Sequence, residues 1–341
     1  MVAFTKYNNL GEPFAVYREE PLVPRIDDRF LDCSIYLYPK EERAGRGESA
    51  GGSGFLAAIP GFGPGWMLGG KCPQEDFYHS YAVSNAHVAE KHPVVRLNRD
   101  DSSTANGHFT IFPFTRDDWT FSDEYDIAVA PIDYKEGHRY LFIPEERFLT
   151  PEIAARHDVG IGDEVFMIGR FINHEGRQRN NPSVRWGHVA MMPVEVPDDV
   201  DQPKKIEKDF VVETHSIAGY SGSPVIVRPL PAHKLLSHVS DYLYVPVVEA
   251  NTNVLLSGST PGSPVHPVAA RFGGPWLLGI ERAFIHYKTE QSIKANTGMS
   301  AVVPAWHILD LLNTDKLKMQ RRAEQERLLK SIEREGTTLT E

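Results

Sequence analysis

The stretch AGYSGSPVIV (residues 218–227) places Ser221 between two glycines and shortly before a run of β-branched residues. The run VIV (225–227) predicts a buried strand, because β-branched side chains pack well on a pleated surface. Gly219 and Gly222 permit backbone angles that other residues avoid. A serine hydroxyl is a poor nucleophile at neutral pH unless a base removes its proton. The stretch therefore directs the search to a histidine and a carboxylate elsewhere in the chain.

Two other segments place polar residues where a predicted strand meets a loop. His87 follows the apolar start of YAVSNAHVAE (81–90), and Asp126 directly precedes IAVAPI in DEYDIAVAPID (123–133). Such positions let a rigid scaffold present side chains to solvent. Taken alone, each residue is better explained by a structural role: His87 as a strand-end histidine, Asp126 as a turn acid and Ser221 as a loop serine.

The composition of the 341-residue chain is that of a globular protein, with 41% hydrophobic and 24% charged residues. The net charge is −10 and basic residues form only short runs, so we expect no nucleic-acid partner. The two cysteines, Cys33 and Cys72, build no disulfide framework and lack the C-x-x-C spacing of zinc sites. No run of eighteen apolar residues occurs, and MVAFTKYNNLGEPF (1–14) lacks a signal-peptide pattern. We expect a cytoplasmic protein without a membrane partner.

Short predicted strands form two successive groups, separated by clusters of Gly, Pro and Asp. Because no long helical period interrupts them, a parallel βαβ sheet is not expected, and an all-β fold of two barrels in series is. AWHILDLL (305–312) has the apolar spacing of a helix that docks on a barrel. The expected divisions are an N-terminal extension (1–30), a first barrel (31–150), a second barrel (151–312) with a Pro-rich insertion (229–275), and a charged C-terminal helix (313–341).

The three polar residues, taken together, resemble the active-site motifs of the trypsin-like (chymotrypsin-fold) serine peptidases. SNAH (84–87) is similar to the family's T-A-A-H, DIA (126–128) to its Asp before Ile-Ala, and GYSGSP (219–224) to G-x-S-G-G-P. The order His, Asp, Ser is also the family's. The resemblance extends over residues 31–312, where GGSGF (51–55), GDEVFMIGRF (162–171) and LLGIERAF (277–284) are similar to further strands of the family.

The resemblance implies two six-stranded antiparallel β-barrels, a C-terminal α-helix and a serine endopeptidase of the intracellular microbial type. By this resemblance Ser221 attacks the peptide carbonyl, His87 accepts its proton and Asp126 orients the imidazole. The backbone N–H groups of Gly219 and Ser221 would form the oxyanion hole. No cofactor and no metal are expected, since HVAEKH (87–92) lacks the H-E-x-x-H spacing of zinc peptidases.

The sequence departs from the family at the nucleophile and in the expected substrate pocket. Tyr220 replaces the Asp that pairs with a cleaved N-terminus in digestive-type members, so we expect no activation by such a cleavage. The family's Ser-Trp-Gly is missing from IERAF (280–284), which favours a narrow substrate preference. The candidate pocket residues are His215, Ser216, Glu281 and Arg282.

A second hypothesis is a catalytically inactive relative that serves as a protein-binding module. In that case the 229–275 insertion and the C-terminal helix would be its contact surfaces, and under either hypothesis they are candidate sites for a regulatory protein. An α/β-hydrolase is not expected, because its G-x-S-x-G motif requires Gly where this chain has Ser223, and its order of Ser, acid and His differs.

Overall fold

The computed structural model describes 13 sections of the chain: residues 2–7, 13–18, 26–61, 78–99, 108–133, 138, 140–172, 174, 176–197, 206–214, 219–228, 274–288 and 294–338. The predicted insertion lies outside the described residues except for 274–275. The N-terminal extension, expected to be irregular, contains an antiparallel hairpin of β1 (Val2–Tyr7) and β2 (Pro13–Arg18).

The first lobe is an eight-stranded sheet with strand order β7-β6-β3-β4-β5-β9-β8, in which β10 pairs in parallel with β4. Among the described residues this sheet is open at β7 and β8, whereas a closed six-stranded barrel was expected. Its strands are β3 (Ser34–Tyr38), β4 (Gly52–Pro60), β5 (Tyr78–Ser84), β6 (Val94–Asn98), β7 (Phe109–Phe112), β8 (Thr120–Phe121), β9 (Ala128–Pro131) and β10 (Ile143–Pro144).

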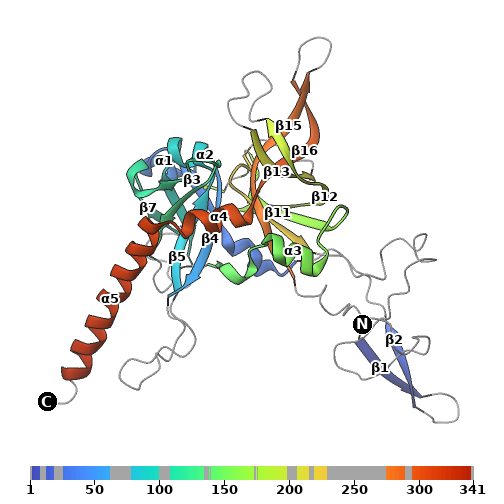
Figure 1. Cartoon of the computed structure of the whole chain (residues 1–341), viewed down its shortest axis with the longest axis horizontal. Coiled ribbons are helices and arrows are strands. Elements are labelled where there is room, and N and C mark those ends of the chain that lie inside the picture. Colours follow the sequence, from blue (N-terminus) through green and yellow to red (C-terminus); the bar gives the residue numbers. More distant parts are fainter. Residues whose placement is uncertain are drawn as a thin grey trace.

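The second lobe is the expected closed barrel of six antiparallel strands, with strand order β11-β12-β13-β16-β15-β14. The predicted VIV run lies in β14, where its three residues are buried. Figure 1 shows the barrel beside the first sheet. Its strands are β11 (Glu164–Arg170), β12 (Pro182–Pro197), β13 (Ile206–Glu213), β14 (Pro224–Arg228), β15 (Trp276–Lys288) and β16 (Lys294–Pro304).

The two lobes share one apolar core. Phe55 and Val83 of the first sheet belong to the same buried cluster as Phe166, Ile226 and Leu277 of the barrel. Full burial of such a side chain contributes about 1.5–3 kcal/mol, so separating the lobes would expose a costly surface. The junction is therefore a rigid place to build a site from both lobes.

A buried cation also ties the lobes together. Arg96 of β6 is fully buried, and its guanidinium donates to the Gly176 carbonyl at 2.7 Å and to the Asn180 Oδ1 at 2.7 Å. Both acceptors precede β12 of the barrel. Because a buried guanidinium needs its donors satisfied, this contact fixes the loop against the first sheet.

The described residues also form five α-helices: α1 (Glu41–Arg46), α2 (Ala86–Lys91), α3 (Pro151–His157), α4 (Ala305–Leu312) and α5 (Asp315–Thr338). The bounds of α4 are those predicted. The start of α5 docks on β5, where Arg321 donates to the Tyr81 hydroxyl at 3.1 Å and His79 Nδ1 lies 2.7 Å from Glu324 Oε2. Farther along, α5 leads away from the first sheet (Figure 1). None of the described helices is both long and apolar enough to cross a membrane.

Candidate active site

Strand pairing in the first lobe brings His87 and Asp126 together. Ser84 at the end of β5 pairs with Ala128 at the start of β9, so the residues that follow one strand lie beside those that precede the other. Asn85 Nδ2 donates to the backbone carbonyl of Asp126 at 2.9 Å and closes this junction. His87 is then the second residue of α2, directly beside the aspartate.

The two side chains are joined through both carboxylate oxygens. The His87 backbone N–H donates to Asp126 Oδ1 at 2.9 Å, and His87 Nδ1 lies 2.6 Å from Asp126 Oδ2. The aspartate is 15% exposed, whereas the imidazole is 47% exposed. The carboxylate therefore holds an imidazole whose other edge is open to solvent.

The pKa values of the pair are shifted in opposite directions. Burial acts to lower the pKa of His87, but the hydrogen bond with Asp126 and the charges of Asp126 and Glu281 outweigh it, and the pKa is raised. Burial acts to raise the pKa of Asp126, but the bonds to His87 and the charge of Arg282 lower it. An ionised carboxylate only accepts, so Nδ1 is the donor and neutral His87 keeps Nε2 as its proton acceptor.

Ser221 lies in a tight turn, residues 219–223, hereafter the Ser221 turn. The Ser223 N–H donates to the Tyr220 carbonyl at 2.8 Å. Gly222 has a φ of +91°, and a Cβ there would lie 1.9 Å from the Ser53 carbonyl oxygen, so both the backbone angle and the space require glycine. The Ser221 hydroxyl donates to the Arg282 carbonyl at 3.2 Å, and among the described residues it makes no hydrogen bond to His87.

The turn and α2 meet at Gly52. A Cβ built on Gly52 would lie 2.7 Å from Val88 Cγ1, next to His87, and 2.9 Å from the Ser221 carbonyl oxygen. β15 approaches both groups from another side: the Gly222 N–H donates to the Glu281 carbonyl at 2.9 Å, while the Glu281 charge acts on His87. The Ser221 turn and α2, which carries His87, thus both lie against Gly52 at the junction of the lobes.

Three backbone N–H groups of the Ser221 turn, those of Gly219, Tyr220 and Ser221, have no acceptor within the described chain. Gly219 and Ser221 are the pair that the family resemblance implies for an oxyanion hole. Gly219 has a φ of +103°, which favours glycine at that position as well. Two such donors can stabilise charge that develops on a substrate oxygen.

No family model matches this sequence, and no curated protein matches it. Among solved structures the chain is similar to the apo MamO protease domain from Magnetospirillum magneticum, with 13% identity, 84% of this chain and 99% of that chain covered, and a TM-score of 0.44. It is also similar to the active form of the Rv3671c protease from M. tuberculosis, with 11% identity, 87% of this chain and 91% of that chain covered, and a TM-score of 0.41. A third similar structure is human heparin binding protein, with 10% identity, 85% of this chain and 96% of that chain covered, and a TM-score of 0.43.

The strand order of this chain itself identifies the fold. The closed antiparallel barrel, the sheet packed beside it and the C-terminal helix decide it. The chain has the trypsin-like double-barrel fold. This confirms the fold class expected from the sequence, with the first barrel open among the described residues.

Only two of the four predicted pocket residues lie within the described parts of the trypsin-like fold. His215 and Ser216 lie outside them. Glu281 and Arg282 are 1% and 2% exposed. The Arg282 guanidinium donates to Asp209 Oδ2 of β13 through Nη2 at 2.7 Å and Nε at 3.1 Å, so its charge is engaged in a buried ion pair. Sequence reasoning missed Asp209, although an acid within the apolar run DFVV (209–212) signals a buried partner.

Tyr220 takes the place of an acid in the Ser221 turn, and the barrel holds it by other means. Its ring is buried, its hydroxyl is hydrogen-bonded to Ser183 Oγ of β12, and the Arg185 guanidinium lies 5.1 Å from the ring centroid. These contacts anchor the turn without a carboxylate.

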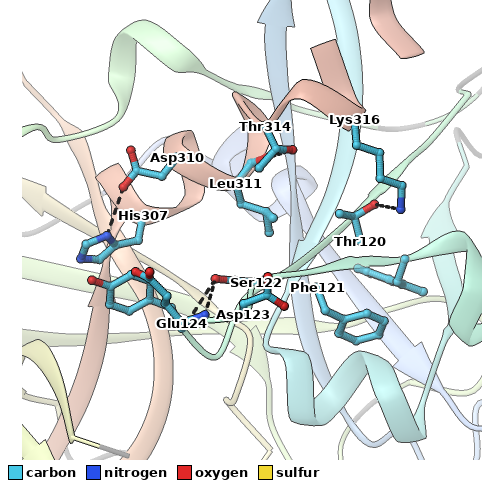
Figure 2. Close-up of a pocket in the computed structure, with 12 residues that line it drawn as sticks. Thr120, Phe121, Ser122, Asp123, Glu124, His307, Asp310, Leu311, Thr314 and Lys316 are labelled. Carbon is cyan, nitrogen blue, oxygen red and sulfur yellow. Dashed lines mark hydrogen bonds and ion pairs between the residues drawn. The ribbon is translucent and has the colours of Figure 1, made fainter. Parts of the chain in front are cut away.

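A groove of about 660 Å³ lies between residues 119–125 and the start of the C-terminal helices. Figure 2 shows the Asp310 carboxylate of α4 directed at the His307 ring, 3.3 Å from Asp310 Oδ2 to His307 Nδ1. The His307 ring stacks on Tyr125, next to Asp126, with 3.6 Å between centroids and 16° between planes. Through this contact α4 braces the loop that presents the aspartate.

Proposed function

We propose that this protein is a serine endopeptidase that hydrolyses peptide bonds in protein substrates. The observation that carries the proposal is the His87 and Asp126 pair, with 2.6 Å between Nδ1 and Oδ2, beside a serine in a glycine turn. Carboxylate, imidazole and hydroxyl in this order are the parts that serine acylation requires. Their assembly at the lobe junction is the reason to assign them one reaction.

The proposed reaction begins when Ser221 Oγ attacks the scissile carbonyl carbon while His87 Nε2 takes the hydroxyl proton. The substrate oxygen becomes an oxyanion and accepts from the N–H groups of Gly219 and Ser221. When the C–N bond breaks, His87 donates its proton to the leaving amine, which leaves an acyl group on Ser221. Water then attacks the acyl carbon while His87 takes a proton from the water. The bond between the acyl carbon and Ser221 Oγ breaks, His87 returns the proton to Oγ, and the carboxylic acid product leaves.

Asp126 serves this reaction by stabilising the imidazolium that forms in each proton transfer. Its low pKa keeps it ionised, so its charge is present when the positive charge develops on His87. Substrate binding must also turn the Ser221 hydroxyl from the Arg282 carbonyl toward Nε2 by rotation about its Cα–Cβ bond. We therefore propose that Ser221 becomes reactive once a substrate is bound.

A binding module without catalysis is the second candidate function, and the hydrogen bond from Ser221 to Arg282 favours it. If that bond persists with ligand bound, the hydroxyl never meets the base. In that case the two lobes would bind a peptide segment without cleaving it.

The deciding experiment is labelling with a fluorophosphonate probe, which reacts with activated serines. We expect the wild-type chain to be labelled and Ser221→Ala to take no label. Ser34→Ala is the control, because it removes the hydroxyl of a buried serine away from the Ser221 turn. A peptide library then gives the cleavage preference. A folded wild-type chain that neither takes the label nor cleaves any peptide would refute the endopeptidase and leave the binding module.

A further inference from the structure

Ser53 of β4 connects the first lobe to the Ser221 turn. It lies in GGSGF (51–55), is fully buried, and belongs to the sheet that also carries α2. The Ser53 backbone N–H donates to the Ser221 carbonyl at 2.9 Å, and the Ser53 carbonyl accepts from Ser84 Oγ at 2.7 Å. The backbone of this one residue thus links β5 to the nucleophile across the lobe junction.

The Ser53 side chain makes two more hydrogen bonds across the junction. Its Oγ accepts from the Arg170 backbone N–H at 2.8 Å and donates to the Gly219 carbonyl at 3.2 Å. A hydroxyl carries a single proton, and Ser53 Oγ donates this proton to the Gly219 carbonyl while its lone pair accepts from Arg170 of β11. The hydroxyl is therefore held in one orientation by partners on both sides.

Ser53 also completes the hydrogen bonding of the Ser221 turn. Three successive carbonyls of the turn are engaged: Gly219 by Ser53 Oγ, Tyr220 by the Ser223 N–H, and Ser221 by the Ser53 N–H. In a trans peptide the N–H points opposite to the carbonyl, so a fixed carbonyl also fixes the next N–H. The Tyr220 carbonyl in this way orients the Ser221 donor.

Space around Gly219 restricts the turn further. A Cβ on Gly219 would lie 2.8 Å from Arg170 Nη2, so the guanidinium of the residue that donates to Ser53 also packs on the glycine. Ser53 and Arg170 together leave the Gly219 backbone little freedom to rotate. A donor pair held in place before substrate arrives stabilises an oxyanion without a reorganisation cost.

We propose that Ser53 is a positioning residue that holds the Ser221 turn so that the N–H groups of Gly219 and Ser221 meet the substrate oxyanion. The inference rests on the proposed peptidase function, and it assigns to one buried hydroxyl of the first lobe the geometry of the donor site in the second. Ser53 itself touches neither substrate nor the reacting atoms.

The test compares Ser53→Ala with Ser34→Ala. Ser34 lies in β3 beside β4, is 3% exposed, and its Oγ has no hydrogen-bond partner among the described residues. Its loss therefore removes a buried hydroxyl without removing a bond seen in the structure. We expect the fluorophosphonate rate constant of Ser53→Ala to fall by about tenfold to a hundredfold, because small displacements of catalytic groups have effects of this size. Ser34→Ala should keep the wild-type rate.

Two further readouts separate positioning from general damage. The pH midpoint of labelling should be the same in Ser53→Ala and wild type, because the His87 and Asp126 contact is intact. Backbone hydrogen exchange of the segment 219–223 should be faster in Ser53→Ala than in wild type or Ser34→Ala, because the turn loses one anchor. If Ser53→Ala does not fold, Ser53→Cys supplies the comparison with a weaker donor of similar shape.

A Ser53→Ala rate within twofold of Ser34→Ala, with unchanged exchange, would overturn the inference. A fall in rate accompanied by a shifted pH midpoint would also overturn it, because the lesion would then lie at His87. A wild-type chain that takes no label contradicts the proposed function instead, and the exchange of residues 219–223 then decides by itself whether Ser53 holds the turn.

Discussion

The two halves of the candidate active site are held by different means. His87 and Asp126 come from adjacent strands of one sheet and bond to each other directly at 2.6 Å. The Ser221 turn belongs to the barrel, but the first lobe holds two of its carbonyls through Ser53. His87 and Asp126 are therefore assembled within one lobe, whereas the position of Ser221 depends on how the two lobes pack.

This difference separates the part of the candidate site that is already oriented from the part whose hydrogen bond must change under the proposed function. The imidazole is oriented in the resting structure, and the Ser221 hydroxyl is directed at the Arg282 carbonyl. Under the proposed function, the Ser221 hydroxyl must leave the Arg282 carbonyl before it can meet His87 Nε2. Substitutions in the two halves should therefore give different signatures.

Replacing the base should have the largest effect. We expect His87→Ala to lower the fluorophosphonate rate constant by up to about a millionfold, the size found when a triad member that moves the proton is removed. His174→Ala, which removes an exposed imidazole from the second lobe, is the control and should label normally. Labelling of folded His87→Ala at the wild-type rate would show that another group activates Ser221.

Asp126→Asn tests the contact between Asp126 and His87. We expect a loss of about ten-thousandfold in rate, because the neutral amide no longer fixes the donor at Nδ1 or stabilises the imidazolium. The wild-type rate should rise with pH through a midpoint above about 6.5, since only neutral His87 accepts a proton and its pKa is raised. In Asp126→Asn that midpoint should fall. A midpoint that stays in place would mean that Asp126 does not set the pKa of His87.

The same shift has a consequence for stability. Protonated His87 gains a partner on folding, so its stabilising contribution is fully present below about pH 6.5 and is lost as the pH rises through its folded pKa. Activity and this contribution to stability therefore change in opposite directions across the same range.

Asp209→Asn tests the buried ion pair between Asp209 of β13 and Arg282 of β15. We expect it to lower the free energy of unfolding by about 3 kcal/mol, because the Arg282 guanidinium loses the carboxylate that compensates its charge. Urea denaturation measures this change. Asp117→Asn, an exposed control, should change stability by less than about 0.5 kcal/mol. Equal stability of the two variants would show that the ion pair between Asp209 and Arg282 does not stabilise the fold.

His307→Ala should have the smallest effect. It removes the ring stacked on Tyr125, and such pairs contribute about 0.5–1.5 kcal/mol. We expect a loss of that size in urea denaturation, with the labelling rate changed only slightly because the hydrogen bonds of Asp126 persist. Met319→Ala on α5, where the side chain is exposed, is the control. A large loss of labelling would mean that α4 sets the geometry of Asp126.

The sequence predicted the elements whose signals are local. The VIV run lies in β14, AWHILDLL forms α4 with the predicted bounds, and Gly219 and Gly222 have the positive φ values that their places beside Ser221 suggest. It did not predict the parallel β10, because a two-residue strand has no pattern of its own. It also did not predict that the first sheet is open among the described residues. Asp209 and Arg282 also escaped notice as a pair, since 73 residues separate them.

By itself the sequence determined the strand-rich fold class, the glycine turn around Ser221, and the ordered set of histidine, aspartate and serine, because strand patterns and turn glycines are properties of neighbouring residues. Only the tertiary structure decided that His87 bonds Asp126, that Ser221 donates to Arg282, and that Ser53 holds Gly219 from 166 residues away. Such hydrogen bonds depend on distances of a few tenths of an ångström, which packing of the two lobes sets and residue spacing does not.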